Sequence, residues 1–263
     1  MIEEKKRVGR RGKSAEAYLE QAVKFEEDGL FLEAIGELEK AVRVADDKLP
    51  IYKELAELYR SQRMVNEAIL AIKKAVKLKP DDVQAREMML EILLEVGRFD
   101  DAIREAQELL RVSPRSLSAR DVLSIAYLQK GMLERALQVT NELINLDPTS
   151  PINHFKKAVL FQQKGDIGSA IWEFSRVLEM QPDSEMAQDA ERALETLDSY
   201  QLRNIVMLAV EDYIFRAKLT RDPESAALER GYYLSESGMA ALKQIQFDEL
   251  PDIYAEWKQR YYH

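Results

Sequence analysis

The sequence has 263 residues, enough for one or two ordinary domains or for one array of repeats. Lysine and arginine number 38 against 47 aspartates and glutamates, so the formal net charge of -9 argues against a general polyanion binder. Cysteine is absent and there are two histidines, which excludes disulfide scaffolds, thiolate metal sites, cysteine nucleophiles and histidine-built metal centres. Charged residues (32%), hydrophobic residues (46%) and few glycines and prolines are typical of a soluble helical protein.

The N-terminal stretch is basic. Residues 1–13 carry a net charge of +4, which leaves -13 for the remainder. Because no aromatic side chains interleave these charges, we expect residues 1–14 to form a disordered basic arm. The alternatives are nucleic-acid or anionic-lipid binding, or packing against the acidic body. No secretory signal and no apolar run of about 20 residues is present, so we predict no membrane span and a cytoplasmic location.

Several types of residue then recur every 34 positions, and each type forms its own column when the periods are aligned. One column is always alanine: Ala34, Ala68, Ala102, Ala136 and Ala170. Five residues earlier stand Gly29, Arg63, Gly97, Gly131 and Gly165, and nine earlier stand Phe25, Tyr59, Leu93, Tyr127 and Phe161. Twelve residues later stand Asp46, Pro80, Pro114, Pro148 and Pro182. Such a period is the signature of a repeat architecture.

Each period predicts a helical hairpin. Glycine tolerates the left-handed conformation that ends many helices, and proline cannot continue a helical hydrogen-bond ladder. The alanine lets the two helices approach closely, and the large residue at minus nine fills the space beside it. Asp81, Asp82, Ser150 and Asp183 are candidate caps for the helices that follow, and Pro151 suits a first helical position. One hairpin cannot bury its own apolar stripe, so we expect neighbouring hairpins to stack.

This spacing resembles the tetratricopeptide repeat. The resemblance implies an all-α, right-handed solenoid of five hairpins, at 15–48, 49–82, 83–116, 117–150 and 151–184, with the register ending at Pro182. We expect a capping helix at 183–199 and a C-terminal helical extension at 200–263. The large aromatic residue that the family places early in the first helix is present as Tyr18 and Tyr52. It is replaced by Arg86, Arg120 and His154.

The extension is predicted to contain four helices: Tyr200–Leu219, a short one from Asp222 to Gly231, one from Ser235 to about Gln246, and Leu250–Tyr261. Residues 209–245 resemble, more weakly, the leader domains of nitrile-hydratase-like precursor peptides. The resemblance is carried by Ala209, Asp212, Phe215, Arg216, Leu219, Asp222, Pro223, Ala226, Gly231, Leu234 and Leu242. It implies a small helical module. No cleavage site or core peptide of that family follows it, which argues against a precursor role.

No catalytic constellation is evident in the sequence. It contains no phosphate-binding loop, dinucleotide glycine pattern, HExxH motif or nucleophile elbow, and the paired acidic residues fall on solvated helix faces. We interpret His154 as a packing histidine. The sequence therefore predicts a protein that is not an enzyme and has neither a cofactor nor a metal site.

The resemblance implies that the first helix of each hairpin lines a concave groove. Copy one contributes Leu19, Val23 and Glu26. The candidate binding residues are Lys53, Glu57, Arg60, Glu87, Glu91, Leu94, Asp121, Ile125, Leu128, Phe155, Val159 and Gln162. The asparagine and lysine clamp of chaperone-binding relatives is missing, which argues against capture of an acidic C-terminus. Because the lining is acidic and then apolar, we expect a partner with basic residues followed by apolar anchors. The alternative is that the chain's own C-terminal helices cover the apolar end.

An aromatic tail closes the sequence, with Tyr254, Trp257 and Tyr261 at helical spacing. Such residues are typical interface anchors. They could pack on the extension, fill the groove or pair two chains into a homodimer. The sequence therefore indicates an adaptor or scaffold that binds a protein partner in the repeat groove. The alternatives are an accessory factor of a biosynthetic or peptide-modification system, acting through the leader-like module, and a nucleic-acid-associated regulator that uses the basic arm.

Overall fold

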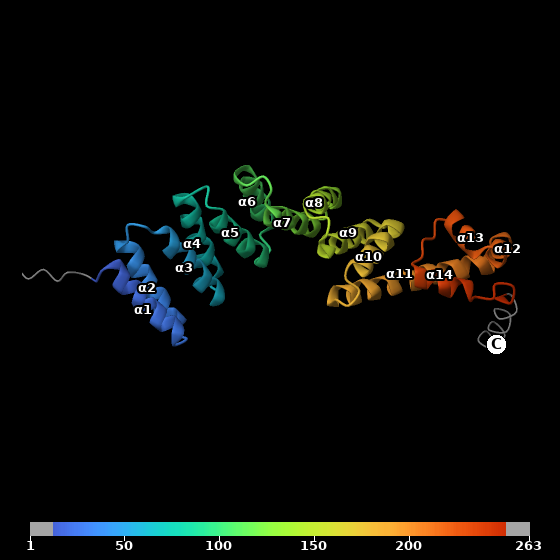
Figure 1. The fold of residues 1–263 in the computed structure, drawn as a ribbon, viewed down its shortest axis with the longest axis horizontal. Coiled ribbons are helices and arrows are strands. Elements are labelled where there is room, and N and C mark those ends of the chain that lie inside the picture. The colour runs from blue at the N-terminus through green and yellow to red at the C-terminus, as the bar shows by residue number, and fades with distance from the viewer. Residues whose placement is uncertain (1–12, 251–263) are drawn as a thin grey trace, which may run out of the picture. The chain divides into compact units, whose positions relative to one another are not determined.

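The computed structural model describes residues 13–250, and within that range the chain forms fourteen α-helices and no strand (Figure 1). This confirms the predicted all-α class. The chain divides between Lys130 and Gly131 into two compact units, which are described in turn. The dividing point falls between the two helices of the fourth predicted hairpin.

The first unit is built of helical hairpins. Its helices are α1 (Ala15–Glu27), α2 (Phe31–Val44), α3 (Leu49–Ser61), α4 (Val65–Leu78), α5 (Val83–Glu95), α6 (Phe99–Val112) and α7 (Leu117–Gln129). Helix α1 packs on α2, α3 on α4 and α5 on α6, and each hairpin contacts the next. The first helices of successive hairpins also touch, α3 with α5 and α5 with α7. Each hairpin thus buries its apolar stripe against a neighbour.

The second unit continues the hairpin pattern and then leaves it. Its helices are α8 (Leu133–Leu146), α9 (Pro151–Lys164), α10 (Ile167–Met180), α11 (Glu185–Glu211), α12 (Tyr213–Arg221), α13 (Pro223–Glu229) and α14 (Glu236–Lys243). Helix α9 packs on α8 and α10, and α11 packs on α10 and α9. Helices α12 and α14 then pack against α11, with α13 contacting both α12 and α14.

The 34-residue period sets the helix starts. First helices begin at Ala15, Leu49, Val83, Leu117 and Pro151, and second helices begin at Phe31, Val65, Phe99, Leu133 and Ile167. The column alanines Ala34, Ala68, Ala102, Ala136 and Ala170 are all fully buried. A larger side chain at these positions would push the paired helices apart or strain the packing, because protein interiors have little free volume.

The turn inside each hairpin uses a left-handed residue. The five residues of the glycine column have φ between 59° and 82°, and the one non-glycine among them is Arg63, at 59°. The turn is closed by backbone bonds such as the one from the N–H of Met64 to the carbonyl of Tyr59, at 2.8 Å. This 6→1 bond is the Schellman pattern that ends many helices. Arginine therefore occupies a conformation that suits glycine.

Prolines and polar caps mark the other boundaries. Pro80, Pro114, Pro148 and Pro182 each lie two residues beyond the end of a second helix. Asp82 accepts a hydrogen bond from the N–H of Ala85 at 2.8 Å and so caps α5. Ser150 is the N-cap of α9 without a side-chain bond, and Pro151 is the first residue of that helix. Helix α11 is capped by Ser184 and not by the predicted Asp183.

Helix α11 corrects the predicted boundary between the capping helix at 183–199 and a second helix at Tyr200–Leu219. The structure has one helix of 27 residues instead, Glu185–Glu211. No glycine or proline interrupts this segment, so nothing breaks the helical ladder near residue 199. The break comes at Asp212, whose carboxylate accepts hydrogen bonds from the N–H groups of Ile214 and Phe215 and so starts α12.

The C-terminal helices form a small module around the second half of α11. Its buried core includes the leader-like positions Ala209, Phe215, Leu219, Ala226 and Leu242, so packing accounts for that pattern. Hydrogen bonds join the segment before α14 to α11. Buried Asp198 accepts hydrogen bonds from the backbone N–H (2.9 Å) and the hydroxyl of Ser235, and the Gln201 amide bonds the backbone of Tyr233. The predicted final helix and the tail residues Tyr254, Trp257 and Tyr261 lie outside the described residues.

Candidate functional site

Nine predicted groove residues lie on α3, α5 and α7 of the first unit, and we call this surface the first-helix face. They are Lys53, Glu57, Arg60, Glu87, Glu91, Leu94, Asp121, Ile125 and Leu128. All nine are exposed or half-buried, and none is buried. Because α3 touches α5 and α5 touches α7, the structure brings these side chains onto neighbouring helices, where a bound segment could contact several of them.

Arg60 is the centre of a charge network on this face. Its Nη1 lies 2.9 Å from Glu91, and its Nε lies 2.8 Å from Glu95, both on the next first helix. Glu57, one turn earlier on α3, lies 3.8 Å from the same guanidinium. Three carboxylates therefore surround one arginine, which leaves this part of the face acidic. Glu95 was not among the predicted residues, although it lies one turn beyond Glu91.

Lys53 is already engaged within the protein. Its ammonium lies 2.7 Å from the side-chain oxygen of Gln84 and 3.4 Å from Asp82. The N–H of Ala85, followed by the charge and hydrogen bond of Lys53, holds the pKa of Asp82 below its ordinary value. Lys53 thus stabilises the start of α5 and contributes little free positive charge to the face.

Two further carboxylates meet at the end of this face, between α1 and α3. Glu54 lies within hydrogen-bonding reach of Glu26, and burial, followed by the charge of Glu26, raises the pKa of the Glu54 carboxyl. The Oε1 atom of Glu26 is buried and has no hydrogen-bond partner within the described chain. An unpaired buried oxygen next to a second acid is an unfavourable arrangement unless a cation joins it. Glu54 was missed, because its register position faces the preceding hairpin.

The second unit carries the remaining predicted groove residues on α9. Phe155 packs edge-on against Phe174 of α10, with ring centroids 5.4 Å apart. Phe155 and Val159 are half-buried against a core cluster to which α11 contributes Leu194 and Leu197, whereas Gln162 is exposed. Helix α11 thus helps to form the wall on which this apolar surface rests, and part of each ring and side chain stays accessible.

The column that replaces the family aromatic contains buried polar pairs. Arg86 binds Glu105, and His154 Nδ1 lies 2.7 Å from Glu173. In both pairs the two residues are 19 positions apart, so repeats three and five use the same contact between first and second helix. Lys157 also lies 2.7 Å from Glu173, whose side chain is almost fully buried. His154 is therefore buried as a packing histidine would be, but with a polar partner.

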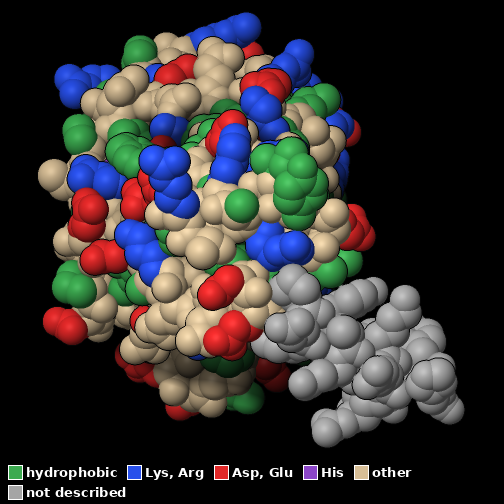
Figure 2. Space-filling model, turned by 90° about the vertical axis from the view of Figure 1, so that its right-hand side faces the viewer, with side chains coloured by type: hydrophobic (Ala, Val, Ile, Leu, Met, Phe, Trp, Pro, Cys, Tyr) green, Lys and Arg blue, Asp and Glu red, His purple; other side chains and the backbone are tan. Residues whose placement is uncertain are grey.

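Metal sites or membrane spans among the described residues would also bear on function. Within residues 13–250 no group of three or more histidine, aspartate or glutamate side chains could hold a metal ion. No helix in that range has the length and apolar character needed to cross a membrane. On the face drawn in Figure 2, lysine and arginine side chains lie among acidic and hydrophobic ones.

Comparison with known sequence families identifies repeats in two stretches of the chain. Residues 49–82 and 87–151 each match a sequence profile of the tetratricopeptide repeat. These stretches are tetratricopeptide repeats, as the spacing predicted, and the class generally serves as a protein-interaction scaffold rather than as a catalyst. No curated protein sequence matches the chain.

Solved structures with the same fold have low sequence identity to this chain. MamA (41-end) from Desulfovibrio magneticus RS-1 is 20% identical, with a TM-score of 0.59 over 66% of this chain and 98% of that chain. YrrB, described as a TPR protein with an unusual peptide-binding site, is 19% identical, with a TM-score of 0.56 over 68% of this chain and 92% of that chain. These similarities establish the repeat fold.

Proposed function

We propose that this protein is a non-catalytic adaptor whose first-helix face binds a segment of a partner protein that carries basic residues. The observation that carries the proposal is the pair formed by Glu26 and Glu54. One oxygen of Glu26 is buried without a partner, and the pKa of Glu54 is raised. Both side chains are half-buried, so a lysine or arginine side chain from a partner could approach the pair and reduce the repulsion between the two carboxylates.

The charges farther along the face favour the same partner chemistry. Glu57, Glu91 and Glu95 share one arginine, and Lys53 is held by Asp82 and Gln84. An acidic segment would therefore meet repulsion, whereas a basic one would meet several carboxylates at once. Stacked hairpins hold these side chains at fixed spacing, which lowers the entropic cost of binding.

Apolar residues follow the acidic ones on this face. Leu94, Ile125 and Leu128 are half-buried on α5 and α7. We propose that they accept apolar anchors of the same segment, so that the partner presents basic residues first and apolar residues next. In the second unit, Phe155 and Val159 on α9 are proposed as a further apolar contact, with Gln162 as a polar residue beside them.

A pull-down with charge-reversed variants tests this function. In the double variant Glu57→Lys, Glu91→Lys the binding of a genuine groove partner is expected to fall at least tenfold, because like charges now face its basic residues. The matched control is Glu33→Lys, Glu108→Lys, which changes the net charge equally but on the second helices α2 and α6.

The interpretation depends on the difference between the two variants. The proposal is supported by partners that bind the control variant, do not bind the groove variant, and are eluted by rising salt. An identical set of partners in wild type and groove variant would refute it. Circular dichroism of both variants establishes that the helical fold is retained.

A further inference from the structure

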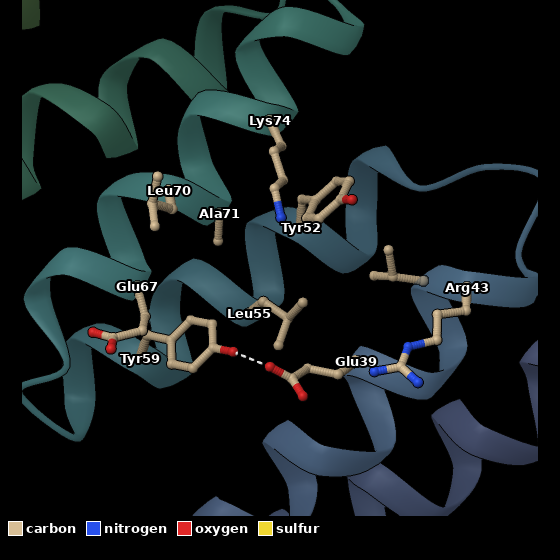
Figure 3. Close-up of a pocket in the computed structure, with 10 residues that line it drawn as sticks. Glu39, Arg43, Tyr52, Leu55, Tyr59, Glu67, Leu70, Ala71 and Lys74 are labelled. Atoms are coloured by element: carbon tan, nitrogen blue, oxygen red, sulfur yellow. Dashed lines mark hydrogen bonds between the residues drawn. The ribbon is translucent and has the colours of Figure 1, made fainter.

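A second candidate site lies in the first unit, in a cavity between α2, α3 and α4. Its volume is about 360 Å³, and α3 forms its floor with Tyr52, Leu55 and Tyr59 (Figure 3). Helix α2 supplies one wall and α4 the other. Tyr52, Leu55 and Tyr59 follow helical spacing and point to the cavity, whereas Lys53, Glu57 and Arg60 are offset from them by about one residue, so the cavity and the first-helix face use different sides of α3.

The cavity exists because a small residue stands opposite the family aromatic in this repeat. Ala71 on α4 occupies the register position that is Glu105 in the next repeat, where Glu105 binds Arg86 across the hairpin. In the second repeat the corresponding residues are Ala71 and Tyr52, and alanine cannot fill the same space. The sequence therefore leaves a hollow here, whereas the next repeat fills the equivalent position with a buried ion pair.

Two cations stand on the walls of this cavity. Arg43 reaches it from α2 and Lys74 from α4, and both side chains are exposed (Figure 3). The Lys74 ammonium lies 5.3 Å from the centroid of the Tyr52 ring. Among residues 13–250 neither Arg43 nor Lys74 forms an ion pair with a carboxylate. Two flexible cations beside an apolar floor could converge on one anionic group.

Hydrogen-bond acceptors stand toward the Tyr59 end of the same cavity. The Tyr59 hydroxyl donates to Glu39 at 2.6 Å, and Glu67 lies beside the Tyr59 ring, across Leu55 from Arg43 (Figure 3). These carboxylates would repel a second anion there and would accept hydrogen bonds from N–H groups. The lining thus combines cations, an apolar floor made by Leu55 and its neighbours, and acceptors.

The size of the cavity narrows the class of ligand. A volume of about 360 Å³ lies near the lower end of the range for small-ligand pockets. It suits one large apolar side chain and its adjoining polar groups, and it is too small for a longer segment. A C-terminal peptide residue carries a carboxylate, an apolar side chain and backbone N–H donors in one compact group.

We propose that this cavity binds the C-terminal residue of a peptide when that residue is apolar. The α-carboxylate lies between Arg43 and Lys74, and the apolar side chain rests on Leu55 and Ala71. The preceding N–H groups face Glu39 and Glu67. This site is independent of the basic segment proposed for the first-helix face and takes a different chemistry.

The test uses the full chain and a tripeptide that ends in phenylalanine and is acetylated at its N-terminus. Binding is measured by calorimetry and by NMR shifts of the Ala71 and Leu55 signals, for the free acid and for the C-terminal amide. The free acid is expected to bind at least tenfold more tightly. Arg43→Ala and Lys74→Ala are each expected to weaken the free acid at least threefold without affecting the amide. Lys73→Ala, a matched exposed lysine on α4, is expected to change neither.

The outcomes separate this site from its alternatives. Equal affinity for acid and amide, or no binding of the acid at millimolar concentration, would overturn the proposal. Equal binding of 3-phenylpropionate would overturn the peptide assignment, because a free carboxylic acid would then suffice. The groove variant Glu57→Lys, Glu91→Lys is expected to bind the tripeptide normally, so failure of the groove proposal leaves this result unaffected.

Discussion

Replacing Arg63 with glycine is expected to stabilise the first unit. Arg63 has a φ of 59° at the turn between α3 and α4, in the left-handed region where the other four repeats carry glycine. Within residues 13–250 its side chain makes no ion pair or hydrogen bond, and it is exposed. The substitution therefore removes backbone strain without removing a contact of the side chain.

The magnitude follows from two opposing terms. A non-glycine residue in the left-handed region costs about 1–2 kcal/mol. Glycine has a more flexible unfolded state, which costs about 0.5–1 kcal/mol. The Arg63→Gly variant should therefore gain about 0.5–1 kcal/mol. For a chain of this size, that corresponds to a rise in Tm of roughly 1–4 °C.

Urea unfolding followed by circular dichroism measures the effect as a higher midpoint at unchanged slope. Arg63→Ala is the matched control, because alanine removes the long charged side chain but keeps the Cβ atom that causes the strain. It is expected to leave stability nearly unchanged. The reverse substitution, Gly29→Arg, should destabilise by a similar amount, since Gly29 has a φ of 73° and no atom lies within 4 Å of an added Cβ.

The reasoning would be refuted in either of two cases. If Arg63→Gly does not raise the midpoint, the left-handed turn is not strained. If Arg63→Ala stabilises as much as Arg63→Gly, the gain comes from loss of the side chain and not from the backbone.

Three further predictions concern buried or crowded acids. Glu54→Gln is expected to stabilise the protein at pH 7 and to have little effect at pH 3.5. The pKa of Glu54 is raised in the folded state, so its contribution favours folding at low pH and is lost as pH rises through that pKa. Glu173→Gln is expected to lower stability by about 3 kcal/mol in urea unfolding, because it removes the charge of a nearly fully buried carboxylate that both His154 and Lys157 contact. Asp198→Ala is expected to cost about 2–3 kcal/mol and to expose the segment around Ser235 to limited proteolysis.

The Glu173→Gln variant has a control of the same chemistry on the surface. Glu179→Gln removes an exposed pair with Arg176 and should cost less than about 0.5 kcal/mol. If Glu173→Gln costs no more than this, the buried pair contributes little. A stabilisation by Glu54→Gln that persists unchanged at pH 3.5 would contradict the proposed repulsion with Glu26. Protease resistance equal to wild type in Asp198→Ala would show that other contacts hold the segment.

Much of the repeat fold could be predicted from the sequence because its signals are local and recur. The alanine, glycine and proline columns each report a steric requirement that acts within one hairpin, so spacing alone places the helix ends. The boundary of α11 could not be predicted in this way. The 34-residue period stops at Pro182, and no helix-breaking residue follows before Asp212. The sequence therefore does not distinguish one long helix from a capping helix followed by a second helix.

The sequence predicts which of the candidate residues share a face, but not which side chains contact one another. Register places Glu57, Arg60 and Glu91 on one face, and the structure agrees. Register does not show that Lys53 is held by Gln84, or that Glu54 meets Glu26, since these contacts depend on rotamers and on the distance between neighbouring first helices. The cavity above Tyr52 was missed because its cause, an alanine at position 71, looks like an ordinary small core residue.

The ion pairs in the aromatic column have a consequence for how such arrays can be lengthened or recombined. Arg86 and Glu105 belong to one hairpin, as do His154 and Glu173, so each of these buried pairs is completed within its own hairpin. A recombination point at the turn around Gly97 would separate Arg86 from its partner and bury an unpaired charge. A crossover near Pro114 would move the pair intact. The viable unit of exchange in this chain is therefore the hairpin and not the single helix.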